Sequence, residues 1–563
     1  MKHLIGILCP RQHISRVKSA LDIDGLMRGG VQSIQIGFLL LLLVTIVFGA
    51  LAKRLKTPYP ILLVIAGLLV SFVPGIPRIA LNPDVIFFVF LPPLLYSAAW
   101  NTSWREFSST LANILMLAVV MVGATVFGVA AAAPWFFAGF DWRTGVVLGA
   151  AVATTDAIAA TSIARRLGVS RRIVDVIEGE SLVNDATGLL ALEFAVAAVV
   201  SGQSFSVADG ILRLAYLSVA GIAVGLIVSV IVEWVERRID DGPIEIAISI
   251  LVPYAAYLAS EALHASGVLA VVTCGLYLSR RSAHFFSPGV RIQARAVWQA
   301  LTFVLNGIVF VLIGVQLPQV LAGIRNYDLP ALLRIGAVFA LLVIALRLIW
   351  VYPGAYLAWI IRTRILHHRV PRPPARNILI VGWTGLRGVI ALAAAMSLPQ
   401  VLANGAPFPN RDLIIFLTFS VIMATLVGQG LTLPLLIRVL GLQSFQEGDQ
   451  EEFEARREIL NAALGRLEDM RNEDTGRFAD VYDDVAQHYR TRLSTLTDEG
   501  ADEHGTTAQH TRRYDEVSRE LVGLERRIAI DLRNRGRISD EALRRVLYEL
   551  DLDETRIVAS ETE

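Results

Sequence analysis

Two acids, an amide and two hydroxyls lie within the ten residues 179–188 (GESLVNDATG) of an otherwise apolar stretch. Helical spacing places Ser181 beside Asp185 and Glu180 beside Asn184, so the cluster presents two adjacent polar rows on one side of a helix. The Asp185 carboxylate suits a hard cation or a proton, and Asn184 can hydrogen-bond to a neighbouring helix. The pattern indicates a cation- or proton-binding site in an apolar environment.

Two further apolar stretches are interrupted by polar or flexible residues near their midpoints. Thr155 and Asp156 lie in the middle of 144–164, and the run 382–388 (GWTGLRG) lies in 377–399. Three glycines and a threonine within that run weaken a helix. Irregular backbone inside a membrane is tolerated only where it lines a cavity or is buried in protein. We therefore expect two broken helices that meet at a transport site.

Charged side chains are rare in the apolar stretches, and each costs about 2.5–3.5 kcal/mol near the centre of a bilayer. Besides the residues above, the retained charges are Glu193, Glu245, Glu261, Arg347 and Arg387. We interpret the three glutamates as lying near span ends or in helix packing. Arg387 requires an anion, and Glu180 is the best candidate, so we predict a structural Glu180–Arg387 ion pair.

The composition is that of a membrane protein, with 54% hydrophobic residues, 18% charged residues and a mean hydropathy of +0.56. The net charge is +1 and the basic residues are scattered, so nucleic acid is not an expected partner. The two cysteines, Cys9 and Cys274, exclude a disulfide framework and argue against a cysteine metal site. No cofactor is expected. The sequence has no His-Glu-x-x-His motif and no Ser/His pairing, so enzymatic activity is not expected either.

Apolar runs of about 20 residues, the length that crosses a bilayer, recur along the chain. We predict thirteen spans: 34–53, 59–75, 84–100, 111–137, 144–164, 173–200, 211–234, 243–262, 266–280, 296–321, 330–360, 377–399 and 412–439. Connections after odd-numbered spans hold 19 Lys and Arg, against 6 after even-numbered spans. Because cytoplasmic loops carry the excess of Lys and Arg, we expect the N-terminus outside and the C-terminus in the cytoplasm.

Three regions follow from this pattern. Residues 1–32 form an N-terminal extension, or translation begins at Met27; residues 33–440 form the transmembrane domain. Residues 441–563 form a charged cytoplasmic domain whose apolar residues fall on helical faces. An amphipathic tail that packs on itself or on a partner subunit is the favoured interpretation, and a ligand sensor is the alternative.

Four motifs together resemble the sodium/proton exchanger family of monovalent cation/proton antiporters, of the CPA1 type. They are GESLVND at 179–185, TTD at 154–156, FLPPLL at 90–95 and GLRG at 385–388. The resemblance implies an all-α protein of about thirteen transmembrane helices, with inverted six-helix repeats and crossed broken helices. It also implies a homodimer in the cell (inner) membrane, in contact with lipid.

The same resemblance implies electroneutral exchange of one Na⁺ for one H⁺ at Asn184 and Asp185. It places Thr155, Asp156 and Ser181 at or beside the cation, so Na⁺ is expected at Asp185, Asp156, Ser181 and Thr155, and it pairs Glu180 with Arg387. One departure is Ser97, because many relatives carry an acidic residue at this position. Cation preference, with Li⁺ or K⁺ as alternatives to Na⁺, is therefore open.

Exchange requires one carboxylate that cannot remain without a bound proton or cation. An unpaired charge in low dielectric is costly, so Asp185 should hold either a proton or a cation before the bundle rearranges. That competition is antiport by alternating access, serving pH and cation homeostasis. A cation channel lined by the same cluster, or a membrane receptor signalling through 441–563, are the alternative interpretations.

Overall fold

The computed structural model describes residues 23–55, 57–73, 83–136, 139–201, 207–324, 328–365, 367, 371–402, 405–442, 446–474, 478–499, 506–535, 537 and scattered positions between 543 and 554. The chain divides into two compact units, Met1–Ser444 and Phe445–Glu563. The first unit therefore ends close to the boundary expected from the change in composition.

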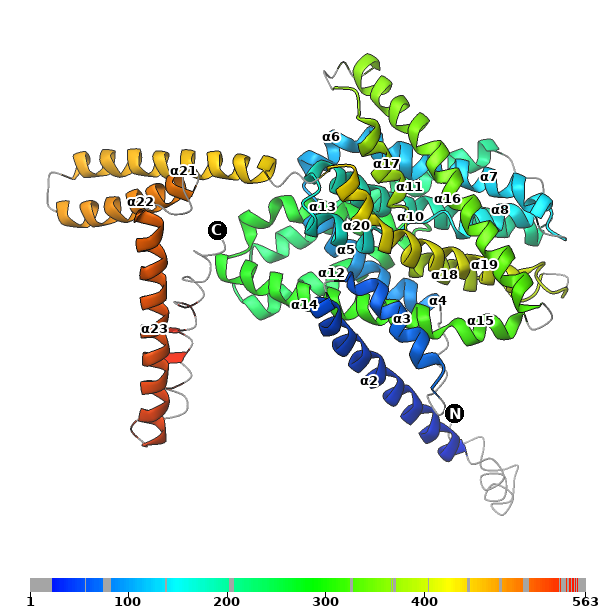
Figure 1. Ribbon diagram of the computed structural model, residues 1–563, viewed down its shortest axis with the longest axis horizontal. Helices are drawn as coiled ribbons and strands as arrows, with labels where there is room; N and C mark the ends of the chain where they lie inside the picture. Colours follow the sequence, from blue (N-terminus) through cyan, green and yellow to red (C-terminus); the bar gives the residue numbers. More distant parts are fainter. Residues whose placement is uncertain are drawn as a thin grey trace, which may run out of the picture. The chain divides into compact units, whose positions relative to one another are not determined.

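The described part of the first unit consists of helices joined by short loops (Figure 1). In chain order the helices are α2 (Ile23–Leu55), α3 (Tyr59–Ser71), α4 (Pro83–Val85), α5 (Leu91–Asn101), α6 (Trp104–Leu115), α7 (Met121–Phe136), α8 (Trp142–Ala151), α9 (Ala157–Arg166), α10 (Arg171–Ser201), α11 (Val207–Glu236), α12 (Gly242–Ala262), α13 (Gly267–Phe285), α14 (Pro288–Val315), α15 (Leu317–Gly323), α16 (Leu329–Ile360), α17 (Ala375–Trp383), α18 (Val389–Met396), α19 (Arg411–Met423) and α20 (Gly430–Val439). Four π-helical turns continue neighbouring helices: η1 (Ile86–Phe90), η2 (Met116–Val120), η3 (Ile361–Ile365) and η4 (Ala424–Gln429).

Every predicted span overlaps a helix, or helices that follow one another in the chain, among the described residues. Within the described residues, 9 helices are long and apolar enough to cross a membrane by themselves. The other predicted spans correspond to α3, α13 and the two broken pairs α8–α9 and α17–α18. Helix α2 begins at Ile23, inside the predicted extension, whereas residues 1–22 lie outside the described residues.

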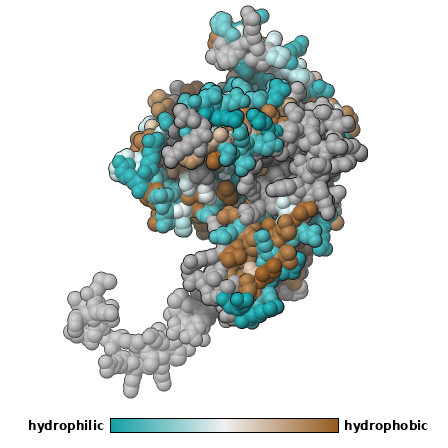
Figure 2. Space-filling model, turned by 90° about the vertical axis from the view of Figure 1, so that its left-hand side faces the viewer, coloured by the Kyte–Doolittle hydropathy of each residue, from teal (hydrophilic) through white to brown (hydrophobic). Residues whose placement is uncertain are grey.

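Large apolar side chains reach the surface of the first unit. Leu39 on α2, Leu212 on α11 and Leu341 on α16 are each more than 60% exposed. Figure 2 shows hydrophobic residues open at the surface beside hydrophilic ones. Such exposure is costly in water but favourable against lipid, and it fits helices that pack together and face a bilayer.

The two broken helices meet at their interruptions, as predicted. The first break separates α8 from α9, and the second separates α17 from α18. The Asp156 amide in the first break donates a 2.7 Å hydrogen bond to the Leu386 carbonyl in the second. Gly388 allows this approach, because a Cβ there would lie 2.4 Å from the Asp156 Oδ2 atom. Gly388 therefore leaves room for the Asp156 side chain beside the second break.

Arg387 does not form the ion pair predicted for it. Its Nε atom donates to the Val152 carbonyl at 2.8 Å and its Nη1 atom donates to the Gly385 carbonyl. Val152 lies at the C-terminal end of α8, where the backbone carbonyls are unpaired and the helix dipole is negative. The buried guanidinium thus satisfies the end of a broken helix.

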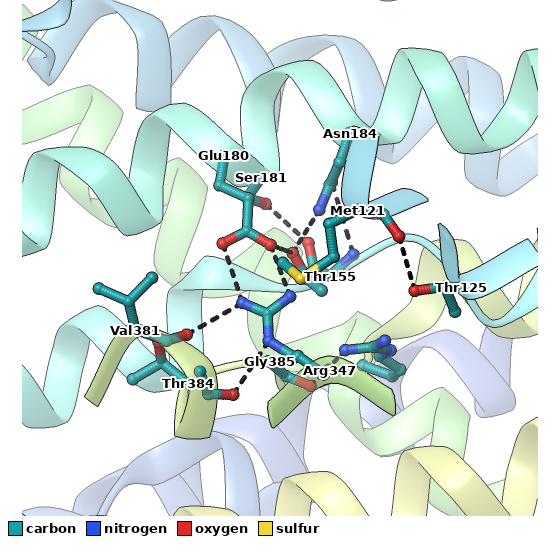
Figure 3. A network of polar contacts seen from close by, with 12 residues as sticks. Met121, Thr125, Thr155, Glu180, Ser181, Asn184, Arg347, Val381, Thr384 and Gly385 are labelled. Carbon is teal, nitrogen blue, oxygen red and sulfur yellow. Dashed lines mark hydrogen bonds and ion pairs between the residues drawn. The ribbon is translucent and has the colours of Figure 1, made fainter. Parts of the chain in front are cut away.

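Arg347 of α16 is the partner of Glu180 instead (Figure 3). Its Nη1 and Nη2 atoms donate to Glu180 Oε1 and Oε2 at 2.6 and 2.9 Å, in a two-pronged geometry that suits a carboxylate. Arg347 also donates to the Val381 and Gly382 carbonyls near the C-terminal end of α17, at 3.1 and 3.0 Å. The predicted Glu180–Arg387 pair is wrong, because the Glu180 carboxylate is bound by Arg347, which lies on another helix.

The second unit contains α21 (Gln446–Glu473), α22 (Ala479–Glu499) and α23 (Thr506–Asn534). Helix α21 packs on α22, and Arg471 pairs with Asp483 across their contact. On α23, Leu521, Leu524 and Ile528 are between 44% and 52% exposed. These three residues of the predicted apolar pattern are therefore partly exposed among the described residues of the unit, whereas Leu543 is only 9% exposed.

We expect Arg347→Ala to destabilise the protein by about 3–5 kcal/mol, because it leaves the buried Glu180 carboxylate without a partner. Thermal unfolding of the purified protein in detergent measures the change. The matched control is Arg334→Ala, which removes an exposed arginine from the same helix. The double variant Glu180→Gln/Arg347→Met, which removes both charges, should recover part of the loss. Equal unfolding temperatures for the two single variants would contradict the assignment.

Candidate functional site

Asp185 lies on α10, the long helix that contacts α8, α9, α17 and α18 around the two breaks. Its side chain is buried, with the residue 3% exposed. Its Oδ1 atom is fully buried and accepts no hydrogen bond within the part of the chain that the structure describes. Buried polar atoms are normally satisfied, so this oxygen calls for a proton or a ligand.

The first break is held against α10 by Thr155 (Figure 3). The Ser181 hydroxyl donates to the Thr155 carbonyl at 2.8 Å, and Asn184 Nδ2 donates to Thr155 Oγ1. The Thr155 amide lies 3.5 Å from Asn184 Oδ1, and its hydroxyl donates to Glu180 Oε1 at 3.4 Å. Polar residues at successive turns of α10 thus satisfy a stretch of backbone that has left the helix. Asn184 acts here as a clamp on Thr155.

Asp156 is the N-cap of α9. Its Oδ1 atom accepts a 2.8 Å hydrogen bond from the Ile158 amide, which satisfies one of the free N–H groups of the first turn. Its Oδ2 atom lies against Gly388, the residue before α18. The N-terminal ends of both short helices therefore place positive dipole charge near this carboxylate.

One cavity of about 790 Å³ joins the predicted cation ligands. Thr155, Asp156, Ser181 and Asp185 all line it. Glu180 and Asn184 do not, since one pairs with Arg347 and the other binds Thr155. The structure thus brings together two carboxylates and two hydroxyl-bearing residues, an all-oxygen set that suits a hard cation.

The cavity extends to charged residues at one end of the bundle. Arg165 and Glu178 line it and form an ion pair of 2.7 Å. Arg291 and Arg295 of α14 line it as well and are exposed. All three arginines belong to connections that the Lys and Arg distribution assigns to the cytoplasmic side. The predicted site therefore lies in a cavity that reaches the arginine-rich end of the bundle.

Sequence reasoning missed Asn306 of α14. This residue lines the same cavity, is 7% exposed, and its Oδ1 atom is buried without a hydrogen-bond partner among the described residues. The signal available was the one asparagine inside the apolar run 296–321. Ser97, the departure noted in the sequence, also lines the cavity.

The three glutamates interpreted as structural do not line this cavity. Glu193 pairs with Arg213 at 3.0 Å and its side chain is 61% exposed. Glu261 is exposed near the C-terminal end of α12. Glu245 is 2% exposed in the first turn of α12, and its Oε2 atom has no hydrogen-bond partner among the described residues. None of them contributes to the cluster around Asp185.

Known proteins are similar to this chain over most of its length. The family described as sodium/hydrogen exchanger, transmembrane, matches residues 38–439. An uncharacterized Na⁺/H⁺ exchanger of Mycobacterium tuberculosis is 32% identical over 547 residues, covering 95% of this chain and 97% of the relative. A Na⁺/H⁺ antiporter of Aphanothece halophytica is 32% identical over 415 residues, covering 73% of this chain and 75% of the relative.

A solved structure, that of the sodium proton antiporter MjNhaP1 from Methanocaldococcus jannaschii at pH 8, has the same fold. It superposes with a TM-score of 0.54 at 18% identity, covering 73% of this chain and 99% of that chain. The extent of the family match and the identity to the relatives lead to one conclusion: this chain belongs to the sodium/hydrogen exchanger family.

Proposed function

We propose that this protein exchanges Na⁺ for H⁺ across the cell membrane, with Asp185 as the group that binds each in turn. The observation that carries the proposal is the buried Asp185 Oδ1 atom, which has no partner among the described residues and belongs to a residue lining a large cavity. A carboxylate in this position is costly unless a proton or a cation neutralises it. Binding of one ion therefore excludes the other.

Asp156 differs from Asp185 in how its charge is stabilised. Asp156 accepts a backbone hydrogen bond and lies near the N-terminal ends of α9 and α18. Both features stabilise a negative carboxylate. Asp156 therefore acts as a standing negative charge that attracts the cation, and Asp185 as the group that exchanges it. Thr155 and Ser181 contribute further oxygens to the Na⁺ site.

The inward-facing state of an alternating-access cycle is the best account of this cavity. Its walls come from α9, α10 and α18, and also from α5 and α14. The first three are tied to each other through the breaks, so they can move as one body against α5 and α14. The cavity reaches arginines of connections predicted to be cytoplasmic. We place the N-terminus outside, the C-terminus in the cytoplasm and the protein in the inner membrane as a homodimer.

The cation is proposed to be Na⁺, with Li⁺ and K⁺ as the competing substrates. A relative from Bacillus pumilus that is 32% identical over 449 residues is named a sodium, potassium, lithium and rubidium/H⁺ antiporter. In this chain Ser97 presents a hydroxyl where a third carboxylate would raise the negative charge of the cavity. Measurement of proton flux with each cation in turn decides the preference.

We expect Asp185→Asn to abolish cation-dependent proton flux in proteoliposomes, because an amide neither releases a proton nor neutralises a cation. The matched control is Glu193→Gln, which removes a carboxylate from the same helix outside the cavity and should retain exchange. Both variants should insert and unfold like the unmodified protein. Na⁺-dependent proton flux that persists in Asp185→Asn would refute the assignment.

The Asp156→Asn variant removes the charge of this side chain but keeps its N-cap of α9, because asparagine is as good an N-cap as aspartate. We expect this variant to keep the stability of the protein but to raise the Na⁺ concentration for half-maximal flux about tenfold or more, since a charge near the cation is lost. Asp156→Ala removes the cap as well and should also cost about 0.5–2 kcal/mol in unfolding. An unchanged half-maximal Na⁺ concentration in Asp156→Asn would limit this residue to a capping role.

A further inference from the structure

A second cavity, of about 160 Å³, lies away from the Na⁺ site. It is formed by residues of α6 and η2, the N-terminal end of α10, the end of α16 with η3, and the segment 371–378 that leads into α17. Three arginines line it: Arg172, Arg362 and Arg372. No acidic residue does so. The cavity is therefore positive, and nothing in its lining balances the charge.

Arg362 is the most constrained of the three arginines. The residue is only 7% exposed, and it forms no ion pair with any residue that the structure describes. A buried guanidinium without an anion is costly, since it has lost water and gained no opposite charge. Arg372 lies over the Tyr356 ring at 4.9 Å, which holds its guanidinium at the cavity. The buried Arg362 charge therefore calls for an anion, and the exposed Arg172 and Arg372 lie beside it at the cavity.

Two backbone and side-chain features narrow the chemistry of that anion. Helix α17 begins at Ala375 after Pro374, and no side chain caps its first turn, so its N-terminal end adds positive dipole charge. Asn377, which also lines the cavity, has a buried Oδ1 atom with no donor among the described residues. An acceptor in that position needs a hydroxyl or another donor. The ligand should thus carry a phosphate and a hydroxyl together.

The remaining walls are apolar. Met116, Leu117, Val351 and Trp359 face the same cavity. A free inorganic phosphate would gain nothing from these side chains, whereas an acyl chain or glycerol backbone would bury apolar surface against them. The arginines come from the connections that carry the Lys and Arg excess, on the side where anionic lipids concentrate in a cell membrane.

We propose that this cavity binds the headgroup of an anionic, hydroxyl-bearing glycerophospholipid. The phosphate lies among Arg172, Arg362 and Arg372, and a headgroup hydroxyl donates to Asn377 Oδ1. The site touches the transport machinery through Val381, which lines the cavity and whose carbonyl accepts a 3.1 Å hydrogen bond from Arg347. Bound lipid therefore supports the segment of α17 that Arg347 holds. The proposal does not depend on which cation is exchanged, and a measurement of lipid binding tests it without any measurement of transport.

The test is the thermal unfolding of the full-length protein in detergent, titrated with phosphatidylglycerol, phosphatidylcholine or inorganic phosphate. We expect phosphatidylglycerol to raise the unfolding temperature and the other two to leave it unchanged. Arg362→Gln should shift the half-maximal phosphatidylglycerol concentration about tenfold upward, because a hydrogen bond to a charged group is lost. The matched control is Arg364→Gln, which removes an exposed arginine from the same turn that does not line the cavity, and it should respond like the unmodified protein.

Arg372→Gln serves as a second variant if Arg362→Gln does not fold, because Arg372 is exposed and its loss should not affect folding. It should show the same upward shift. The proposal fails if every variant that folds, of Arg362→Gln and Arg372→Gln, has the same half-maximal phosphatidylglycerol concentration as the Arg364→Gln control. Stabilisation of the unmodified protein by inorganic phosphate alone, to the same extent, would overturn the lipid assignment and identify a free-phosphate site.

Discussion

A helix that ends in the middle of a membrane leaves backbone groups that water cannot satisfy, and this constraint shapes the rest of the structure. Two such helices end near each other here, so four helix ends need partners in one place. At the carbonyl end of α8, Arg387 donates a hydrogen bond to the Val152 carbonyl. At the carbonyl end of α17, Arg347 donates to the Val381 and Gly382 carbonyls. Cations at carbonyl ends also complement the helix dipoles.

The amide end of α9 is satisfied in a complementary way. Asp156 caps α9 with its side chain, and its own amide reaches the Leu386 carbonyl of the other break. Around this crossing, α10 supplies Ser181 and Asn184 to hold Thr155. Most polar side chains of the motif 179–185 are thus needed to stabilise irregular backbone. Of the four residues in the proposed transport site, Asp185 has a buried oxygen, Oδ1, with no hydrogen-bond partner among the described residues.

The sequence allowed this region to be located, but not all of its pairings to be assigned. Polar density in an apolar run, and a run of glycines in another, were sufficient to predict two breaks that meet, because few other structures tolerate such residues in a bilayer. The choice between Arg347 and Arg387 was not predictable in the same way. Both lie at similar depth, and depth along a span does not reveal which helix face is turned toward Glu180. Asn306 was missed for a related reason, since a single asparagine in an apolar run gives no periodic signal.

Charge balance around the breaks explains why one carboxylate is left to exchange ions. Among the described residues at the crossing, Arg347 is neutralised by Glu180 through two hydrogen bonds. Arg387 and Asp156 carry opposite charges, and each is bound to a helix end at the same crossing. In the proposed exchange, one proton or one Na⁺ would neutralise the remaining charge of Asp185. A group that must be neutral before it moves, and that can be neutralised in either way, would couple the two ions.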